Sequence, residues 1–105
     1  MESAKIAMFV KKKKSQIFKN RGNEAFQNKK FEAAEKFYSE AIDHNPGLIT
    51  LKLDKPNWTN RAICRNAMKK YADAFHDCDT ALSIDSKFSK VSSVKLTIDH
   101  SYFLI

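Results

Sequence analysis

Small and apolar residues recur along the chain at steps of three and four residues, which is the spacing of one face of an α-helix. In one stretch the residues at these steps are Phe18, Gly22, Ala25 and Phe26. In the next stretch they are Phe31, Ala34, Phe37, Tyr38, Ala41 and Ile42. The pattern predicts two amphipathic helices joined by a short connection.

The same pattern occurs a second time further along the chain. Its markers are Trp58, Ala62, Tyr71, Ala74, Cys78 and Ala81, which stand in the order of Phe18, Gly22, Phe31, Ala34, Tyr38 and Ala41. Small residues let the backbones of paired helices approach closely, while aromatic rings fill the space beside them. We therefore interpret these residues as core rather than as a binding site.

The composition also favours a helical chain. Only two glycines and two prolines occur among the 105 residues, which is too few for the turns of an all-β fold. Apolar residues make up 43% of the chain, enough for one modest core. We predict an all-α fold.

The order of aromatic, small and alanine residues, with Pro46 after the first copy, resembles the tetratricopeptide repeat, a helix-turn-helix unit of about 34 residues. The resemblance places one unit at residues 15–48 and a second at residues 55–88, where Ser86 replaces the proline. It implies a short right-handed α-solenoid of two full repeats and the start of a degenerate third. An inserted loop over residues 49–54 is expected between them.

The two ends of the chain lie outside these units. Residues 1–14 form a basic N-terminal extension, and we interpret its run Lys11 to Lys14 as solvated rather than as a nuclear-import or phosphate-binding motif. Residues 89–105 begin like a third repeat and end as an apolar tail. Repeat proteins generally need three or more stacked units, so either the tail forms an irregular covering helix or the chain is shortened. We favour a shortened chain, which is expected to be marginally stable or to self-associate through exposed apolar surface.

The net charge and the lack of catalytic motifs limit the classes of function that the chain can have. The chain carries 19 Lys and Arg residues against 12 Asp and Glu, and its net charge of +7 favours acidic partners. Its sequence contains no nucleophile–base pair, metal-ligand cluster or glycine-rich phosphate loop. We therefore expect a protein-binding scaffold that is not an enzyme and uses no cofactor and no metal.

The cysteines are typical of a protein in a reducing compartment, and the hydropathy argues against a membrane-spanning segment. Cys64 and Cys78 lack zinc-site spacing, and we expect buried thiols, with Asp77 and Asp79 as solvated residues on either side of Cys78. The apolar residues 6–10 are far too few to span a bilayer. No membrane partner is expected, and the cytoplasm is the expected location, with the nucleus as the alternative.

Polar residues on the first helix of each unit resemble the carboxylate clamp of chaperone-binding tetratricopeptide domains. In that clamp two lysines, two asparagines and one arginine hold the free C-terminal carboxylate and final aspartate of the cytosolic 70- and 90-kDa heat-shock chaperones. The resemblance implies a co-chaperone-like function with the carboxylate bound by Lys19, Asn23, Asn60 and Lys90. It also implies groove contacts with the upstream peptide residues from Phe26, Ile63, Asn66 and Ala67.

The sequence departs from the clamp at its fifth position. Val94 stands where the subclass has arginine, and Lys95 projects about 100° further around the helix. Loss of one charged donor is expected to weaken binding by about one to two orders of magnitude. The resemblance therefore implies a partial clamp.

Two other functions remain open. The chain is alternatively an adaptor for another peptide partner in complex assembly or transport, with a clamp that does not function. Binding of nucleic acid ranks third, because the basic residues are spread around the helices and no exposed aromatic residue is expected for base stacking.

Overall fold

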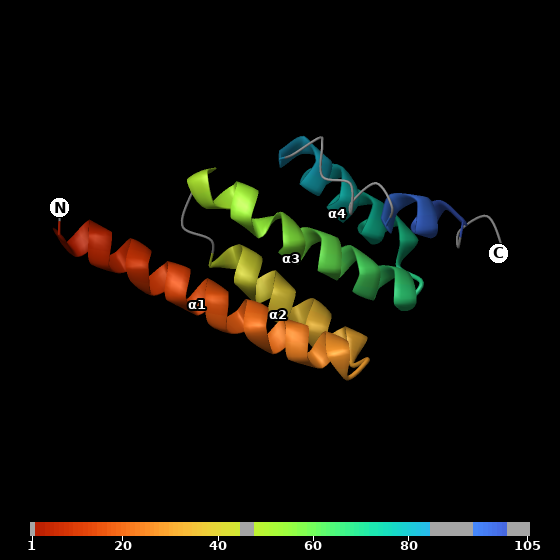
Figure 1. Cartoon of the computed structure of the whole chain (residues 1–105), viewed down its shortest axis with the longest axis horizontal. Coiled ribbons are helices and arrows are strands. Elements are labelled where there is room, and N and C mark those ends of the chain that lie inside the picture. The colour runs from red at the N-terminus through yellow and green to blue at the C-terminus, as the bar shows by residue number, and fades with distance from the viewer. Residues whose placement is uncertain (1, 45–47, 85–93, 101–105) are drawn as a thin grey trace.

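The computed structural model describes residues 2–44, 48–84 and 94–100. Its helices are α1 (Glu2–Gln27), α2 (Phe31–Asp43), α3 (Leu48–Ala67) and α4 (Tyr71–Ile84), and residues 94–100 are also helical. α1 packs against α2, α2 against α3, and α3 against α4 (Figure 1). The predicted all-α architecture of two helical hairpins is confirmed for the described residues.

The two hairpins are closed by the same kind of turn. Lys29 and Lys69 have left-handed backbone conformations, with φ angles of 59° and 63°. The amide of the next residue donates to the carbonyl five residues before it, at 2.9 Å in the first turn and 2.7 Å in the second. This is the Schellman arrangement, in which the left-handed residue is usually glycine.

The buried residues form two clusters. The first, between the hairpins, contains Ala25, Ala34, Tyr38 and Cys64. The second contains Ala62, Ala74, Cys78, Ala81 and Ile98. The small markers of both units are thus in the core, as the periodicity predicts, and Ile98 of the helical residues 94–100 completes the second cluster.

Gly22 permits a close contact between α1 and the Tyr38 ring of α2. A Cβ atom at this position would lie 2.7 Å from Cε1 and 2.8 Å from Cδ1 of the Tyr38 ring. Even alanine is therefore too large here without a shift of the ring. The counterpart in the second hairpin is Ala62, which is fully buried.

The connection between the units differs from the prediction. Residues 49–54, expected as an inserted loop, belong to α3, which begins at Leu48. The inserted residues include leucine and lysine, which favour helix, so they extend the helix instead of forming a loop. Pro56 consequently lies inside α3 rather than in its first turn, and the helix lacks one backbone donor there.

The ends of the chain are described in part. Residues 2–14 are exposed and helical, and they continue directly into the rest of α1, whose first turns extend past the other helices (Figure 1). Of the expected degenerate third repeat, residues 89–93 and 101–105 lie outside the described residues. Within residues 94–100, Ile98 is buried and Leu96 is exposed. Self-association through the tail stays a prediction.

Candidate functional site

Two of the predicted clamp residues meet at one buried side chain. Asn23 lies on α1, Asn60 on α3, and Tyr38 of α2 has no exposed surface. The Tyr38 hydroxyl donates a hydrogen bond to Oδ1 of Asn23 at 2.7 Å. A side-chain hydrogen bond also links Tyr38 with Asn60. The structure therefore brings together the asparagines of two different hairpins.

The environment of Tyr38 keeps its hydroxyl protonated. Burial raises the pKa of Tyr38 to about 12, and the neighbouring Cys64 acts in the same direction, whereas the hydrogen bond with Asn60 acts against them. A hydroxyl with so high a pKa remains a donor throughout the physiological range. The hydroxyl can therefore donate to Asn23 without competition from its ionised form.

Lys19 supplies a cation beside Asn23. It lies one turn earlier on α1, so the two side chains project from the same face. Its side chain is half-buried, and no carboxylate partner is found for it among the side chains that the structure describes. A half-buried ammonium group without a carboxylate is suited to receive an anionic ligand.

The remaining predicted residues differ in exposure and in packing. Ile63 and Asn66 are half-buried on α3 and Ala67 is exposed, whereas Phe26 packs edge-on against Phe31 with ring centroids 6.0 Å apart. Phe26 is therefore partly committed to the first cluster. Oδ1 of Asn66 is buried and accepts no hydrogen bond from the described residues. Lys90 lies outside the described residues.

At the predicted fifth clamp position, no free cation lies within the described part of the chain. Val94 packs against the second cluster. Lys95 forms an ion pair with Asp79 of α4, with 2.8 Å between Nζ and Oδ1. The hydrogen bond and the charge of Asp79 raise the pKa of Lys95. Lys95 is thus directed toward α4, which agrees with the expectation that it does not replace the arginine.

An ion-pair network was missed at the level of sequence. Asp77, expected to be solvated, has no exposed surface. The guanidinium group of Arg61 donates two hydrogen bonds to the Asp77 carboxylate, at 3.0 and 2.8 Å. Arg65 donates a third, at 2.8 Å. The signal available was position, because Asp77 is three residues after Ala74 and four before Ala81, on the buried face of α4.

The same network ties the second hairpin to the first. Arg61 donates to Oγ of Ser39 at 3.0 Å, and Arg65 donates to Glu35 at 2.9 Å. Lys70 also donates to Glu35. Both Ser39 and Glu35 belong to α2, so the network fixes α2 against α3. It holds in place the two helices that carry Tyr38 and Asn60.

The two thiols are buried, as expected. Cys64 and Cys78 are buried and not joined in a disulfide. Burial is the main cause that raises the pKa of Cys64 to about 12 and that of Cys78 to about 11, so neither forms a thiolate near neutral pH. Among residues 2–44, 48–84 and 94–100, no three metal-ligating side chains gather. None of the helices there is both long and apolar enough to cross a bilayer.

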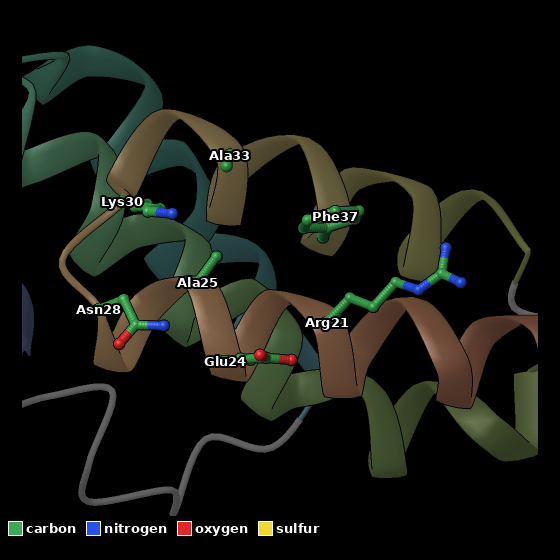
Figure 2. Close-up of a pocket in the computed structure, with 7 residues that line it drawn as sticks. All are labelled: Arg21, Glu24, Ala25, Asn28, Lys30, Ala33 and Phe37. Atoms are coloured by element: carbon green, nitrogen blue, oxygen red, sulfur yellow. The ribbon is translucent and has the colours of Figure 1, made fainter.

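A cavity of about 320 Å³ lies between α1 and α2, away from the predicted clamp. Figure 2 shows the side chains of one helix facing those of the other across it. Its lining comprises Arg21, Glu24, Ala25, Asn28, Lys30, Ala33 and Phe37. The lining contains no predicted clamp or groove residue, so it is a feature separate from the candidate site.

Comparison with known proteins identifies the repeat. The family model described as "Tetratricopeptide repeat" matches residues 15–48. Stress-induced-phosphoprotein 1 of Caenorhabditis elegans is 31% identical over 90 residues, which is 86% of this chain and 26% of that protein. Hsp70/Hsp90 co-chaperone cns1 of Schizosaccharomyces pombe is 32% identical over 76 residues, which is 72% of this chain and 21% of that protein. The chain thus spans about a quarter or less of these relatives.

A solved structure shares the fold. It is described as "First TPR of Spaghetti (RPAP3) bound to HSP90 peptide SRMEEVD". Its TM-score is 0.75 at 25% sequence identity, and the match covers 87% of this chain and 69% of that one. The similarity extends over more of the chain than the matched repeat does, and therefore includes both hairpins.

Proposed function

We propose that this chain, a tetratricopeptide repeat domain related to those of Hsp70/Hsp90 co-chaperones, binds the acidic C-terminal tail of a heat-shock chaperone of the 70- or 90-kDa class. It acts as a binding scaffold and not as an enzyme. The observation that carries the proposal is the meeting of Asn23 and Asn60 at Tyr38. The ammonium group of Lys19, which has no carboxylate partner among the described side chains, lies on the same face as Asn23.

The chemistry of these side chains suits a carboxylate. A terminal carboxylate offers two charged oxygens, which accept hydrogen bonds from amide N–H and ammonium groups. Hydrogen bonds to charged groups contribute about 1.5–3 kcal/mol each. Asn23 and Asn60 supply neutral donors and Lys19 supplies the charge, so three donors serve one end of a peptide.

Long-range charge favours the same ligand. The chain carries a net charge of +7, and the peptide in the related structure, SRMEEVD, contains three acidic residues. Opposite charges steer the encounter and raise the association rate, most strongly at low salt. We expect the association rate to fall as salt is added.

The alternative adaptor function is favoured by the fifth position. Val94 packs against the second cluster and Lys95 is paired with Asp79, so neither supplies the missing cation. Under this alternative the chain binds a peptide along the groove without regard to its terminus.

A peptide titration separates the two functions. The parent chain is titrated with SRMEEVD as the free acid, and the titration is repeated with Lys19→Ala and Val94→Arg. We expect Lys19→Ala to weaken binding about tenfold or more, and Val94→Arg to strengthen it. The matched control is Lys36→Ala, which removes the same charge from an exposed position of α2 and is expected to change little.

One result would contradict the proposal directly. If the parent shows no binding at millimolar peptide and Val94→Arg restores none, the carboxylate site does not exist. Equal losses for Lys19→Ala and Lys36→Ala would show that net charge alone drives the binding.

A further inference from the structure

We infer that Tyr38 is a positioning residue that orients the amide groups of Asn23 and Asn60 toward a bound carboxylate. This inference rests on the proposed function, since it concerns the same site. Tyr38 itself has no exposed surface, so it is not accessible to a peptide. It acts through the two asparagines.

The ring of Tyr38 is held in one place. It lies against Gly22 of α1, so closely that a single added Cβ would approach the ring to 2.7 Å. It belongs to the first cluster together with Ala25, Ala34 and Cys64. Close packing on these sides fixes the position of the hydroxyl relative to α1 and α3.

The hydroxyl then decides which way the Asn23 amide faces. A tyrosine hydroxyl has one proton to donate, and Tyr38 donates it to Oδ1 of Asn23 at 2.7 Å. With its oxygen held, Asn23 presents its NH₂ group to a ligand. The opposite orientation would turn the amide oxygen toward the carboxylate, where two acceptors repel each other.

Asn60 forms the second hydrogen bond of the Tyr38 hydroxyl. The only proton of the Tyr38 hydroxyl is used by Asn23, so the hydrogen bond between Tyr38 and Asn60 must have the Asn60 NH₂ group as its donor. A directed chain runs from Asn60 through Tyr38 to Asn23. Such chains polarise their members in sequence, and this one joins two hairpins at a single oxygen atom.

The second hairpin shows that packing alone does not require a tyrosine here. The counterpart of Tyr38 is Cys78, which is equally buried and fills its place in the second cluster. The tyrosine stands only at the junction where the two asparagines meet. The proposed carboxylate site therefore accounts for the phenolic hydroxyl, and the packing of the repeat does not.

The test removes the hydroxyl and keeps the ring. Tyr38→Phe and the control Tyr71→Phe, which makes the same change on α4, are titrated with SRMEEVD as the free acid and as the C-terminal amide. We expect Tyr38→Phe to weaken free-acid binding about 2- to 10-fold while amide binding stays constant. Tyr71→Phe should leave the ratio of the two affinities unchanged. A merely structural role would weaken both peptides alike.

A double-mutant cycle and NMR spectra of the side-chain amides complete the test. In an Asn23→Ala background, Tyr38→Phe should have a smaller effect on free-acid affinity than in the parent, because only Asn60 then remains for the hydroxyl to orient. In the free protein, Tyr38→Phe should shift the side-chain amide NMR signals of Asn23 and Asn60. Unmoved signals, or full additivity of the two variants, would overturn the inference.

The outcomes distinguish the inference from the proposed function. If the parent prefers the free acid and Tyr38→Phe retains the full preference, the inference is wrong and the proposed function stands. If the parent binds neither peptide, the proposed function is wrong, and the inference is overturned with it.

Discussion

The two hairpins share one arrangement of small and aromatic residues but differ in the polar residues beside it. Arg61 of α3 binds buried Asp77 and also Ser39 of α2. Its counterpart on α1, Arg21, is exposed and lines the cavity between α1 and α2. The counterpart of Asp77 is Phe37, which lines the same cavity.

The difference follows from the neighbours of each hairpin. α3 packs against α2 as well as α4, so its residues Arg61 and Arg65 are largely buried between helices, where a charged group needs a partner. α1 packs mainly against α2, and its residue Arg21 remains in contact with solvent. The repeat pattern thus fixes the apolar core, whereas the partners of the polar residues depend on which helix lies next to them.

The largest loss of unfolding free energy is expected at Asp77, whose counterpart in the first hairpin is Phe37. Asp77→Ala leaves Arg61 and Arg65 without their buried carboxylate, and removal of one partner from a buried ion pair costs about 3–5 kcal/mol. The measurement is urea unfolding followed by circular dichroism. The control Asp79→Ala breaks only an exposed pair with Lys95 and should cost about 1 kcal/mol or less. Equal losses for the two variants would contradict the account.

The second test makes the first hairpin resemble the second. Gly22→Ala introduces the residue that the second hairpin has at Ala62, and its Cβ meets the Tyr38 ring. Overpacking of this kind costs about 1–3 kcal/mol in unfolding free energy. The loss should shrink in a Tyr38→Cys background, which supplies the Cys78 counterpart and removes the clash. An unchanged loss would show that the ring does not require glycine.

Much of the fold could be predicted from the sequence because small and aromatic residues at helical spacing leave few alternatives. Gly22, Ala34, Tyr38 and their counterparts are buried as the periodicity predicts. Residues 49–54 are helix and not the predicted loop, because the repeat length reveals an insertion but not its conformation. Their leucine and lysine residues favour a longer helix instead.

The site could be predicted only in part. The positions of Lys19, Asn23 and Asn60 follow from resemblance and helical spacing, and their roles stay predictions. Tyr38 was correctly predicted as core, but the partners of its hydroxyl come from α1 and α3. Periodicity within one helix cannot identify such partners, since they depend on how three helices pack. The burial of Asp77 follows from its position between Ala74 and Ala81, but its partners Arg61 and Arg65 do not, because they lie on another helix.

A smaller effect concerns the junction of the hairpins at low pH. Burial opposes ionisation of Glu35, but hydrogen bonds from Arg65 and Lys70 outweigh it and lower the pKa of Glu35 below the ordinary value of 4.5. Because the folded pKa is the lower one, the ionised form stabilises the fold above about pH 4.5, and this contribution is lost as the pH falls through the folded pKa. Glu35→Gln should flatten this part of the curve of unfolding free energy against pH. The same change at exposed Glu32 should not.

The smallest effect is expected to be equal in both hairpins. Lys29→Gly and Lys69→Gly place glycine at residues with left-handed backbones, where a side chain is strained. Each should stabilise the fold by about 0.5–1 kcal/mol, seen as a higher thermal midpoint. Lys36→Gly, inside α2, should instead destabilise it by a similar amount. Unequal gains would show that the two turns are not equivalent.

The central claim is that the two hairpins together form a site for a free carboxylate. Its most direct test is calorimetry on the parent chain with SRMEEVD as the free acid and as the amide, under identical salt. The account predicts that the free acid binds about tenfold or more tightly than the amide, since amidation removes the charge that Lys19, Asn23 and Asn60 hold. Equal affinities for the two peptides would contradict it.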